Sequence, residues 1–360
     1  MTRLTRQRPW TLDLRIRVTN ARDRLLAAQQ LSRAGRTPYT VIHHEDLVQV
    51  RHYRRRQGPP QTPLVLVAPL AVNMLIYDLF PERSLVDFLT RAGRDVYLID
   101  WGRPEPRHNH YTLATYVLDL LPPCLAAVRQ HAGQRLLDLH GWSMGGHFIL
   151  CYAGLGEDAD LRRLVILGTS IDSHASGTLG VWAQKLQKSA HWLEKRMGIR
   201  AASWPQSWFY SPGWRNSLNF KLTTPRASLR AYVDLLRKLD DRAYVIEHAT
   251  YGAFLDHMVA YPGGVAKDMF LGAWLNNSFR QGRLRLREHE VDFRRITQAV
   301  LVMAGAEDSM ATVDAVQALL PLLGSQEKRF IVVPGGHMGI LAGSDAPNSA
   351  WAATRQWLES

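Results

Sequence analysis

Cysteine is scarce in this sequence, which holds only Cys124 and Cys151 among its 360 residues. Both lie in apolar stretches, as buried thiols do, and two cysteines are too few for a secreted fold held together by disulfides. We therefore expect two free, buried thiols and a cytoplasmic protein.

Long hydrophobic runs are also missing. The longest one near the N-terminus, LVLVAPLAV at 64–72, is too short to cross a bilayer and is interrupted by Pro69. The first ten residues, MTRLTRQRPW, are basic but lack the apolar block of a secretory signal. The sequence thus predicts neither a transmembrane segment nor a signal peptide.

Motifs that bind nucleotides or metals are absent as well. No G-x-x-x-x-G-K-[ST] stretch and no strand-linked G-x-G-x-x-G occurs. HHED at 43–46 and RHNH at 107–110 offer metal-capable side chains, but neither is joined by a second ligand pair at zinc spacing. We expect no cofactor and no metal.

What the sequence does hold is an uneven positive charge. The formal net charge is +12, and the first sixty residues contain thirteen Arg, no Lys and four Asp or Glu. Such a segment suits nucleic acid, anionic lipid, a phosphate-bearing substrate or an acidic partner, or else forms a solvated face.

Residues 1–38 are expected to form a basic N-terminal helix or arm. An apolar stripe at helical spacing runs along it, and we expect that stripe to dock on the parent domain. The stripe consists of Leu14, Val18, Ala21, Leu25 and Ala28.

Short apolar strands alternate with helices over two stretches, 39–171 and 293–360, after a hairpin expected near 41–53. Strands that are apolar on both faces and separated by helices indicate a mostly parallel, doubly wound sheet, so the predicted fold class is α/β. Ligands bind such sheets at the carboxyl ends of the strands. The buried strands are expected at 64–69, 95–100, 135–139, 162–169, 299–305 and 329–333.

Residues 172–292 break this rhythm. They lack a buried strand run, contain six of the eleven Trp, and are expected to form helices and loops. An insertion of this kind between core strands predicts a helical cap over the site. Its aromatic side chains either pack the cap or form an apolar substrate groove or docking surface.

A candidate nucleophile lies in the stretch HGWSMGGHF at 140–148. Gly141-Trp142-Ser143-Met144-Gly145 follows an apolar strand and opens a helix, and so sharp a turn needs small residues on both sides of the serine. Such a turn exposes the hydroxyl beside the positive end of the helix. The pattern therefore predicts that Ser143 is a catalytic nucleophile.

A serine hydroxyl needs a base, and the base needs a carboxylate to orient it. His337 follows the last core strand in VVPGGHMG, and Asp308 follows the strand at 299–305. The chain order serine, acid, histidine is the one found on such sheets. Glu307 is the main rival for the acid, and Asp172 is a weaker one.

The oxyanion of the reaction needs backbone donors. The Met144 N–H is one candidate, and the loop after the strand at 64–69 supplies the other, from Leu70, Ala71 or Val72. No HGGG motif is present to fix the choice within that loop.

Several of these segments resemble the polyhydroxyalkanoate synthases, most of all the short catalytic subunit of class III. The similarity is carried by the sequence at 62–104, by LLDLHGWSMGGHFILCYAGL, by the acid segment VDFRRITQAVLVMAGAEDSM and by VVPGGHMGILAG. It extends over nearly the whole chain from about Gly35 on. The resemblance implies an α/β-hydrolase fold with a cap over an apolar site, and places the nucleophile, acid and base on Ser143, Asp308 and His337.

The resemblance also implies a reaction. That family polymerises (R)-3-hydroxyacyl-coenzyme A and carries cysteine at the nucleophile, where this chain has Ser143. A serine ester is roughly isoenergetic with the polymer ester, and serine depends wholly on its base. We therefore expect an esterase, thioesterase or polyester depolymerase first, a synthase-type acyltransferase second, and a non-catalytic binding protein third.

The expected partners follow from the same resemblance. The substrate is an acyl ester, a polyester or an acyl-coenzyme A, and no nucleic acid is expected. The basic N-terminus could bind a polymer granule or a partner subunit. The chain could also form a homodimer.

Overall fold

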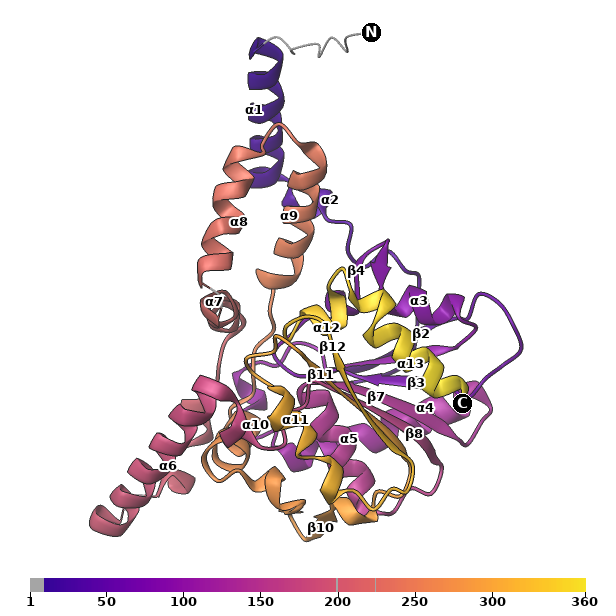
Figure 1. Cartoon of the computed structure of the whole chain (residues 1–360), viewed down its shortest axis with the longest axis vertical. Coiled ribbons are helices and arrows are strands. Elements are labelled where there is room, and N and C mark those ends of the chain that lie inside the picture. The colour runs from indigo at the N-terminus through magenta and orange to yellow at the C-terminus, as the bar shows by residue number, and fades with distance from the viewer. Residues whose placement is uncertain (1–9, 199, 224) are drawn as a thin grey trace.

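The computed structural model describes residues 10–198, 200–223 and 225–360. An eight-stranded sheet forms the centre of the molecule, in the order β1-β2-β6-β3-β7-β8-β11-β12 (Figure 1). The strands β3, β6, β7, β8, β11 and β12 pair in parallel, and β2 runs antiparallel to both of its neighbours. The strands are β1 (Thr40–Glu45), β2 (Val48–Tyr53), β3 (Leu64–Val67), β6 (Val96–Asp100), β7 (Leu137–Trp142), β8 (Leu161–Leu167), β11 (Ala299–Gly305) and β12 (Lys328–Val333).

Helices surround this sheet, which confirms the predicted α/β class. The central strands are apolar on both faces: all four residues of β3 and all five of β6 are buried. Ser84 caps the start of α3, because its hydroxyl accepts a hydrogen bond from the Asp87 N–H. The helices of this part are α3 (Leu85–Arg91), α4 (Leu121–Ala132), α5 (Met144–Leu155), α11 (Val313–Gln317), α12 (Gly339–Ala342) and α13 (Ala350–Glu359), and a small sheet pairs β4 (Asp78–Phe80) with β5 (Arg83–Ser84).

The proposed cap lies between β8 and β11. It is mostly helical, as expected, but it also contains an antiparallel pair of short strands, β9 (Arg283–Leu286) and β10 (His289–Asp292). β9 alternates exposed Arg with Leu, and β10 has Val291 as its only apolar residue, so both lack the continuous apolar run by which the buried strands are recognised. The helices are α6 (Gly177–Met197), α7 (Gly213–Thr223), α8 (Pro225–Arg237), α9 (Arg242–Leu255) and α10 (Gly263–Asp268).

The N-terminal helix α1 (Trp10–Leu26) stands beside α8 and α9, away from the sheet, and α2 (Ala28–Leu31) follows it (Figure 1). The expectation that its apolar stripe docks on the parent domain is wrong, because Leu14, Val18 and Leu25 are more than half exposed. The helix docks through a polar face instead. The amide of Asn20 is buried and donates to the Leu239 carbonyl at 2.6 Å.

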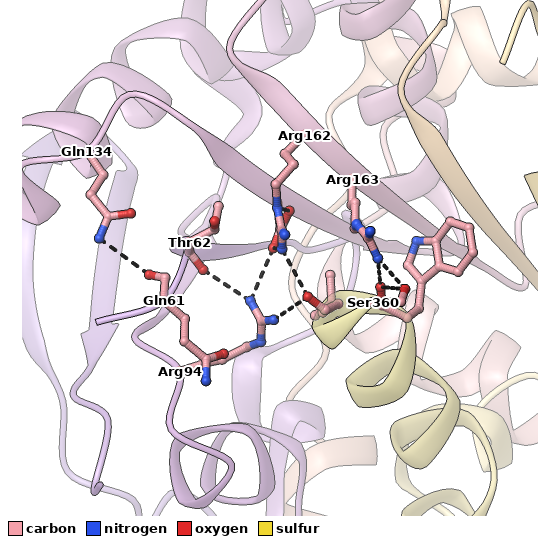
Figure 2. A network of polar contacts seen from close by, with 10 residues as sticks. Gln61, Thr62, Arg94, Gln134, Arg162, Arg163 and Ser360 are labelled. Atoms are coloured by element: carbon pink, nitrogen blue, oxygen red, sulfur yellow. Dashed lines mark hydrogen bonds and ion pairs between the residues drawn. The ribbon is translucent and has the colours of Figure 1, made fainter. Parts of the chain in front are cut away.

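A buried charge cluster closes the end of the sheet opposite the strand ends that carry the predicted site. Arg94 and Arg162 both donate to the carboxylate of Asp138, at 3.1 Å and at 2.5 to 2.8 Å. Both guanidinium groups also donate to the Leu358 carbonyl, and Arg163 bonds to Trp357 and Ser360 nearby (Figure 2). The cluster therefore ties the last turn of α13 to strands β7 and β8.

The sequence also supports predictions about the two cysteines and about membrane-spanning helices. Cys124 and Cys151 are free and buried, as predicted, and burial raises the pKa of the Cys124 thiol to about 12. Among the described residues, no helix combines the length and the apolar character that crossing a membrane requires.

Candidate active site

Strand β7 and helix α5 meet at Ser143 in a turn that strains the backbone. Ser143 has φ 55° and ψ −123°, a conformation that L-residues rarely adopt. Its N–H donates to the Leu167 carbonyl at 2.9 Å, and its carbonyl accepts from the Thr169 hydroxyl at 2.8 Å. The neighbouring strand β8 thus holds both ends of the serine and keeps the side chain raised above the carboxyl end of β7.

The glycines around Ser143 are required by close backbone contacts. A Cβ on Gly141 would lie 2.6 Å from Gly145, and a Cβ on Gly145 would lie 2.0 Å from the Val67 carbonyl oxygen. A Cβ on Gly146 would lie 2.0 Å from Thr169 Oγ1. The pattern around the serine therefore reflects how closely α5 approaches β3 and β8.

The three predicted catalytic side chains come together at this turn. His337 Nε2 lies 2.9 Å from Ser143 Oγ, and His337 Nδ1 lies 2.7 Å from Asp308 Oδ2. The carboxylate is fully buried, and the histidine ring is about one-tenth exposed. This arrangement can take a proton from the serine at Nε2 while the carboxylate fixes the Nδ1–H tautomer.

Asp308 is itself held in place by the backbone. Its Oδ1 accepts hydrogen bonds from the N–H groups of Met310 and Ala311, both at 2.9 Å, so only Oδ2 faces the histidine. The rivals lie elsewhere. Glu307 is exposed, and Asp172 pairs with Arg280 and accepts from Asn277.

Two backbone segments border the serine where an oxyanion would form. Met144 is the first residue of α5, and Leu70 and Val72 line the cavity above Ser143. Ala71 between them has φ 65°. Within the described part of the chain, no hydrogen bond takes up the N–H of Leu70, Ala71, Val72 or Met144, so the whole loop and the helix start keep free donors.

Trp142 positions the histidine, a contact that the sequence analysis missed. Its indole Nε1–H donates to the His337 carbonyl at 3.0 Å, and the two rings lie 5.4 Å apart. Trp142 is the residue before the nucleophile and is buried. An aromatic residue inside the G-x-S-x-G pattern was the available signal, but nothing in the sequence indicates its partner.

A cavity of about 360 Å³ opens on the serine. Its walls are mainly apolar and come from both parts of the chain. Phe220, Tyr261, Phe270 and Trp274 of the proposed cap face Leu70, Val72, Met144 and Met310 of the sheet end. An acyl chain would be enclosed there by hydrocarbon and aromatic rings.

A second imidazole lies one helical turn beyond the nucleophile. His147 lines the cavity, donates through Nε2 to the Ser170 carbonyl at 2.8 Å and contacts the Phe279 ring. Burial lowers its pKa to about 4, and burial lowers that of His140 in β7 to about 4 as well. Both rings are therefore neutral at pH 7.

The metal-capable motifs of the sequence lie near each other. His108 Nε2 lies 3.6 Å from Asp46 Oδ2, so the two motifs do meet. However, no group of three or more His, Cys, Asp or Glu with metal-binding geometry occurs among the residues that the structure describes.

Comparison with known proteins gives a consistent pattern. The family model described as the alpha/beta hydrolase fold matches residues 73–344. The poly(3-hydroxyalkanoate) polymerase subunit PhaC of Allochromatium vinosum is 28% identical over 352 residues, which cover 96% of this chain and 95% of that one. The subunit of the same name from Haloferax mediterranei is 26% identical over 345 residues, or 95% of this chain and 68% of that one.

Solved structures agree on the fold. The structure of DcsB in complex with a substrate analogue superposes with a TM-score of 0.53 at 15% identity, and covers 89% of this chain and 98% of that one. At this identity the likeness concerns the fold alone.

Proposed function

This chain belongs to the α/β-hydrolase fold family, and we propose that it transfers a hydroxyacyl group through an ester on Ser143. The observation that carries the proposal is the contact of Ser143 Oγ with His337 Nε2 at 2.9 Å, completed by Asp308. These side chains come from three separate segments, and a nucleophile with its base and orienting carboxylate is the arrangement that acyl transfer needs.

The first half of the reaction acylates the serine. His337 Nε2 takes the Ser143 proton as Oγ attacks the acyl carbonyl carbon, and the negative charge develops on the carbonyl oxygen. The N–H groups of Met144 and of the Leu70–Val72 loop face that oxygen. The leaving thiolate or alkoxide then departs with the proton from His337, and the acyl group stays on Ser143 as an ester.

The second half releases the acyl group to an acceptor. His337 takes a proton from the acceptor hydroxyl, whose oxygen attacks the ester carbonyl, and the proton returns to Ser143 Oγ. If the acceptor is the hydroxyl of another hydroxyacyl unit, the product is a longer ester. If it is water, the product is a free hydroxy acid.

We propose the synthase-type transfer as the main activity, with (R)-3-hydroxyacyl-coenzyme A as the donor. The names of the relatives support this choice over the hydrolysis that the sequence analysis ranked first. The apolar cavity is a second support, because walls of Phe220, Phe270 and Trp274 disfavour water beside the ester. Thioester cleavage drives the first step, so a serine ester of polymer-like energy still allows growth.

Hydrolysis is the second candidate, and the serine itself favours it. The resemblance implies a cysteine at position 143, where a thioester intermediate would drive each transfer downhill. An oxygen ester gives no such drive, so water competes whenever it enters the cavity.

Covalent labelling tests the shared first half. We expect a fluorophosphonate to modify Ser143 and to leave the Ser143→Ala variant unmodified. Ser170→Ala is the matched control, since Ser170 lines the same cavity but bonds to Ser176. Absence of an adduct on Ser143 in the folded protein would overturn the proposal.

Product analysis separates the two candidates. The protein is incubated with (R)-3-hydroxybutyryl-coenzyme A, thiol release is followed, and products are identified by mass spectrometry. Oligomeric esters support the transferase, and 3-hydroxybutyrate alone supports the hydrolase. The Ser143→Cys variant is expected to increase the ratio of oligomer to free acid.

A further inference from the structure

Exposed large apolar side chains gather on one part of this molecule. Most of the exposed large apolar side chains among the described residues belong to α1 or to residues 179–236. The others are Tyr39, Val41, Leu136 and Val332. Figure 1 shows α1, α8, α7 and α6 in succession along the side of the molecule away from the sheet. A cluster of this kind indicates a contact with another apolar phase or molecule.

Helix α6 shows the pattern most clearly. Leu179, Trp182 and Leu186 follow the spacing of one helix face and are 41%, 61% and 46% exposed. Gly180 and Ala183 are buried and pack against the body of the protein. Trp192 and Met197 are also more than half exposed. We call these five exposed side chains the α6 face.

The charge around the α6 face is almost entirely positive. Residues 177–200 contain five Lys or Arg and one acidic residue, Glu194, which pairs with Arg200. On α6 itself, Lys185, Lys188 and Lys195 are exposed and form no ion pair with any described residue. Lys185 Nζ lies 5.9 Å from the centre of the Trp182 ring, so the apolar side chains are flanked by cations that no described carboxylate pairs with.

This composition decides between the surfaces that could cover the face. A second copy of the chain would bring like charges together, which disfavours association. Lysine is depleted from protein–protein interfaces, whereas helices at lipid surfaces combine Lys and Arg with Trp and Leu. The anionic headgroups of a phospholipid surface would compensate the cations while its acyl region accepts the apolar side chains.

We propose that the α6 face docks this protein on an anionic phospholipid surface. Helix α7 continues the contact with Trp214 and Leu222, which are 70% and 59% exposed. The same helix contributes Phe220 to the wall of the active-site cavity. Docking therefore places the acyl cavity beside an apolar phase.

Vesicle binding tests the proposal, with the full chain carrying Ser143→Ala so that the outcome does not depend on the proposed acyl transfer. We expect co-sedimentation with vesicles of phosphatidylglycerol and phosphatidylcholine in equal parts, and much weaker binding to pure phosphatidylcholine. Raising NaCl from about 0.1 M to about 1 M shortens the screening length to about 3 Å and should weaken the binding.

Two matched substitutions identify the face. Leu186→Glu should raise the apparent dissociation constant for the anionic vesicles about tenfold or more. Leu136→Glu, on the sheet part of the molecule, should leave it unchanged. Leu186 and Leu136 are equally exposed, at 46%, and the two variants have the same net charge. Unaltered thermal unfolding of both variants shows that they fold.

Three outcomes would overturn the proposal. The first is no binding to the anionic vesicles, and the second is equal weakening by Leu186→Glu and Leu136→Glu. The third is self-association or capture of an acidic protein that Leu186→Glu abolishes while vesicles do not bind. That result would assign the face to a protein interface.

Discussion

The orientation of the His337 ring depends on its main chain as well as on Asp308. The indole of Trp142 donates to the His337 carbonyl, so the residue before the nucleophile also fixes the base. Trp142 is buried, so the side chains packed around it hold its ring. At the scale of single residues, Ser143 and His337 are therefore linked twice, by their own contact and by the hydrogen bond from Trp142.

Trp142→Phe keeps an aromatic ring but removes that bond. We expect kcat for thiol release from an acyl-coenzyme A to fall about fivefold to tenfold, which corresponds to about 1 kcal/mol. Trp142 also lines the cavity at Ser143, but the substitution keeps an aromatic ring there, so we expect KM to change less than kcat. A kcat equal to that of the unmodified protein would show that Asp308 alone orients the ring.

Removing the Asp308 carboxylate should lower kcat more than Trp142→Phe does. Asp308→Asn leaves the ring in place but favours the wrong tautomer, and we expect kcat to fall by about 10⁴-fold. Glu307→Gln is the matched control, since Glu307 is exposed beside Asp308, and it should retain the activity of the unmodified protein. Equal losses in the two variants would contradict the assignment of the acid.

Two buried imidazoles give the protein a pH-dependent stability. The pKa of His140 and of His147 is lowered from 6.5 to about 4 by burial. Between pH 6.5 and pH 4 the unfolded chain binds more protons than the folded one, so the free energy of unfolding falls as the pH falls. At pH 5 each ring costs about 2 kcal/mol of stability.

Urea unfolding at pH 7 and pH 5 measures this effect. The loss of stability between the two pH values should be smaller in His147→Gln than in the unmodified protein. His110→Gln, at an exposed ring, should leave the loss unchanged. A loss that is identical in all three proteins would show that His147 does not contribute.

The proposed catalytic residues carry signals in the sequence, and the residues that hold them do not. Ser143, Asp308 and His337 carry local signals, because each follows an apolar strand in a glycine-containing or acidic turn. Trp142 and Thr169 act through backbone carbonyls of distant residues. Such partners depend on the register between strands, which no local pattern specifies.

At the scale of elements, the approach of α5 to the sheet decides whether the site forms. Gly145→Ala places a Cβ 2.0 Å from the Val67 carbonyl oxygen, so the helix start must shift. We expect loss of fluorophosphonate labelling and a destabilisation of about 1 to 3 kcal/mol. At Gly272 an added Cβ meets nothing within 4 Å. Gly272→Ala should therefore keep the fluorophosphonate labelling and the stability of the unmodified protein.

The cluster at Asp138 joins β7, β8 and α13. Asp138→Asn leaves the buried guanidinium of Arg94 without a counter-charge, and we expect a loss of about 3 to 5 kcal/mol in denaturant unfolding. Asp160→Asn removes the exposed pair with Arg135 and should cost less than about 1 kcal/mol. Equal effects would show that burial of the cluster contributes little.

Elements with one strong pattern were predicted well. The apolar runs of β3, β6 and β11 mark buried parallel strands. The apolar stripe of α1 was misread, because helix periodicity identifies an amphipathic face but not what covers it. The strands β9 and β10 were missed, since short, half-exposed strands have no apolar run.

At the scale of the whole molecule, the basic N-terminal helix lies away from the sheet (Figure 1). The N-terminal helix contacts the loop between α8 and α9 through Arg17 and Asn20, and neither residue lines the cavity at Ser143. The arm and the site are therefore separate in space. The sequence showed the charge of the arm, but its place beside α9 depends on contacts more than two hundred residues apart.

The positions of Ser143 and His337 along the chain also govern when reactivity begins. Synthesis proceeds from the N-terminus, so a polypeptide still on the ribosome holds the hydroxyl long before it holds the imidazole. The turn at Ser143 lacks its proposed base until translation has passed β12 and reached His337. If Ser143 and His337 act as proposed, a product that terminates before residue 337 should give no acyl transfer, whatever part of the sheet it assembles.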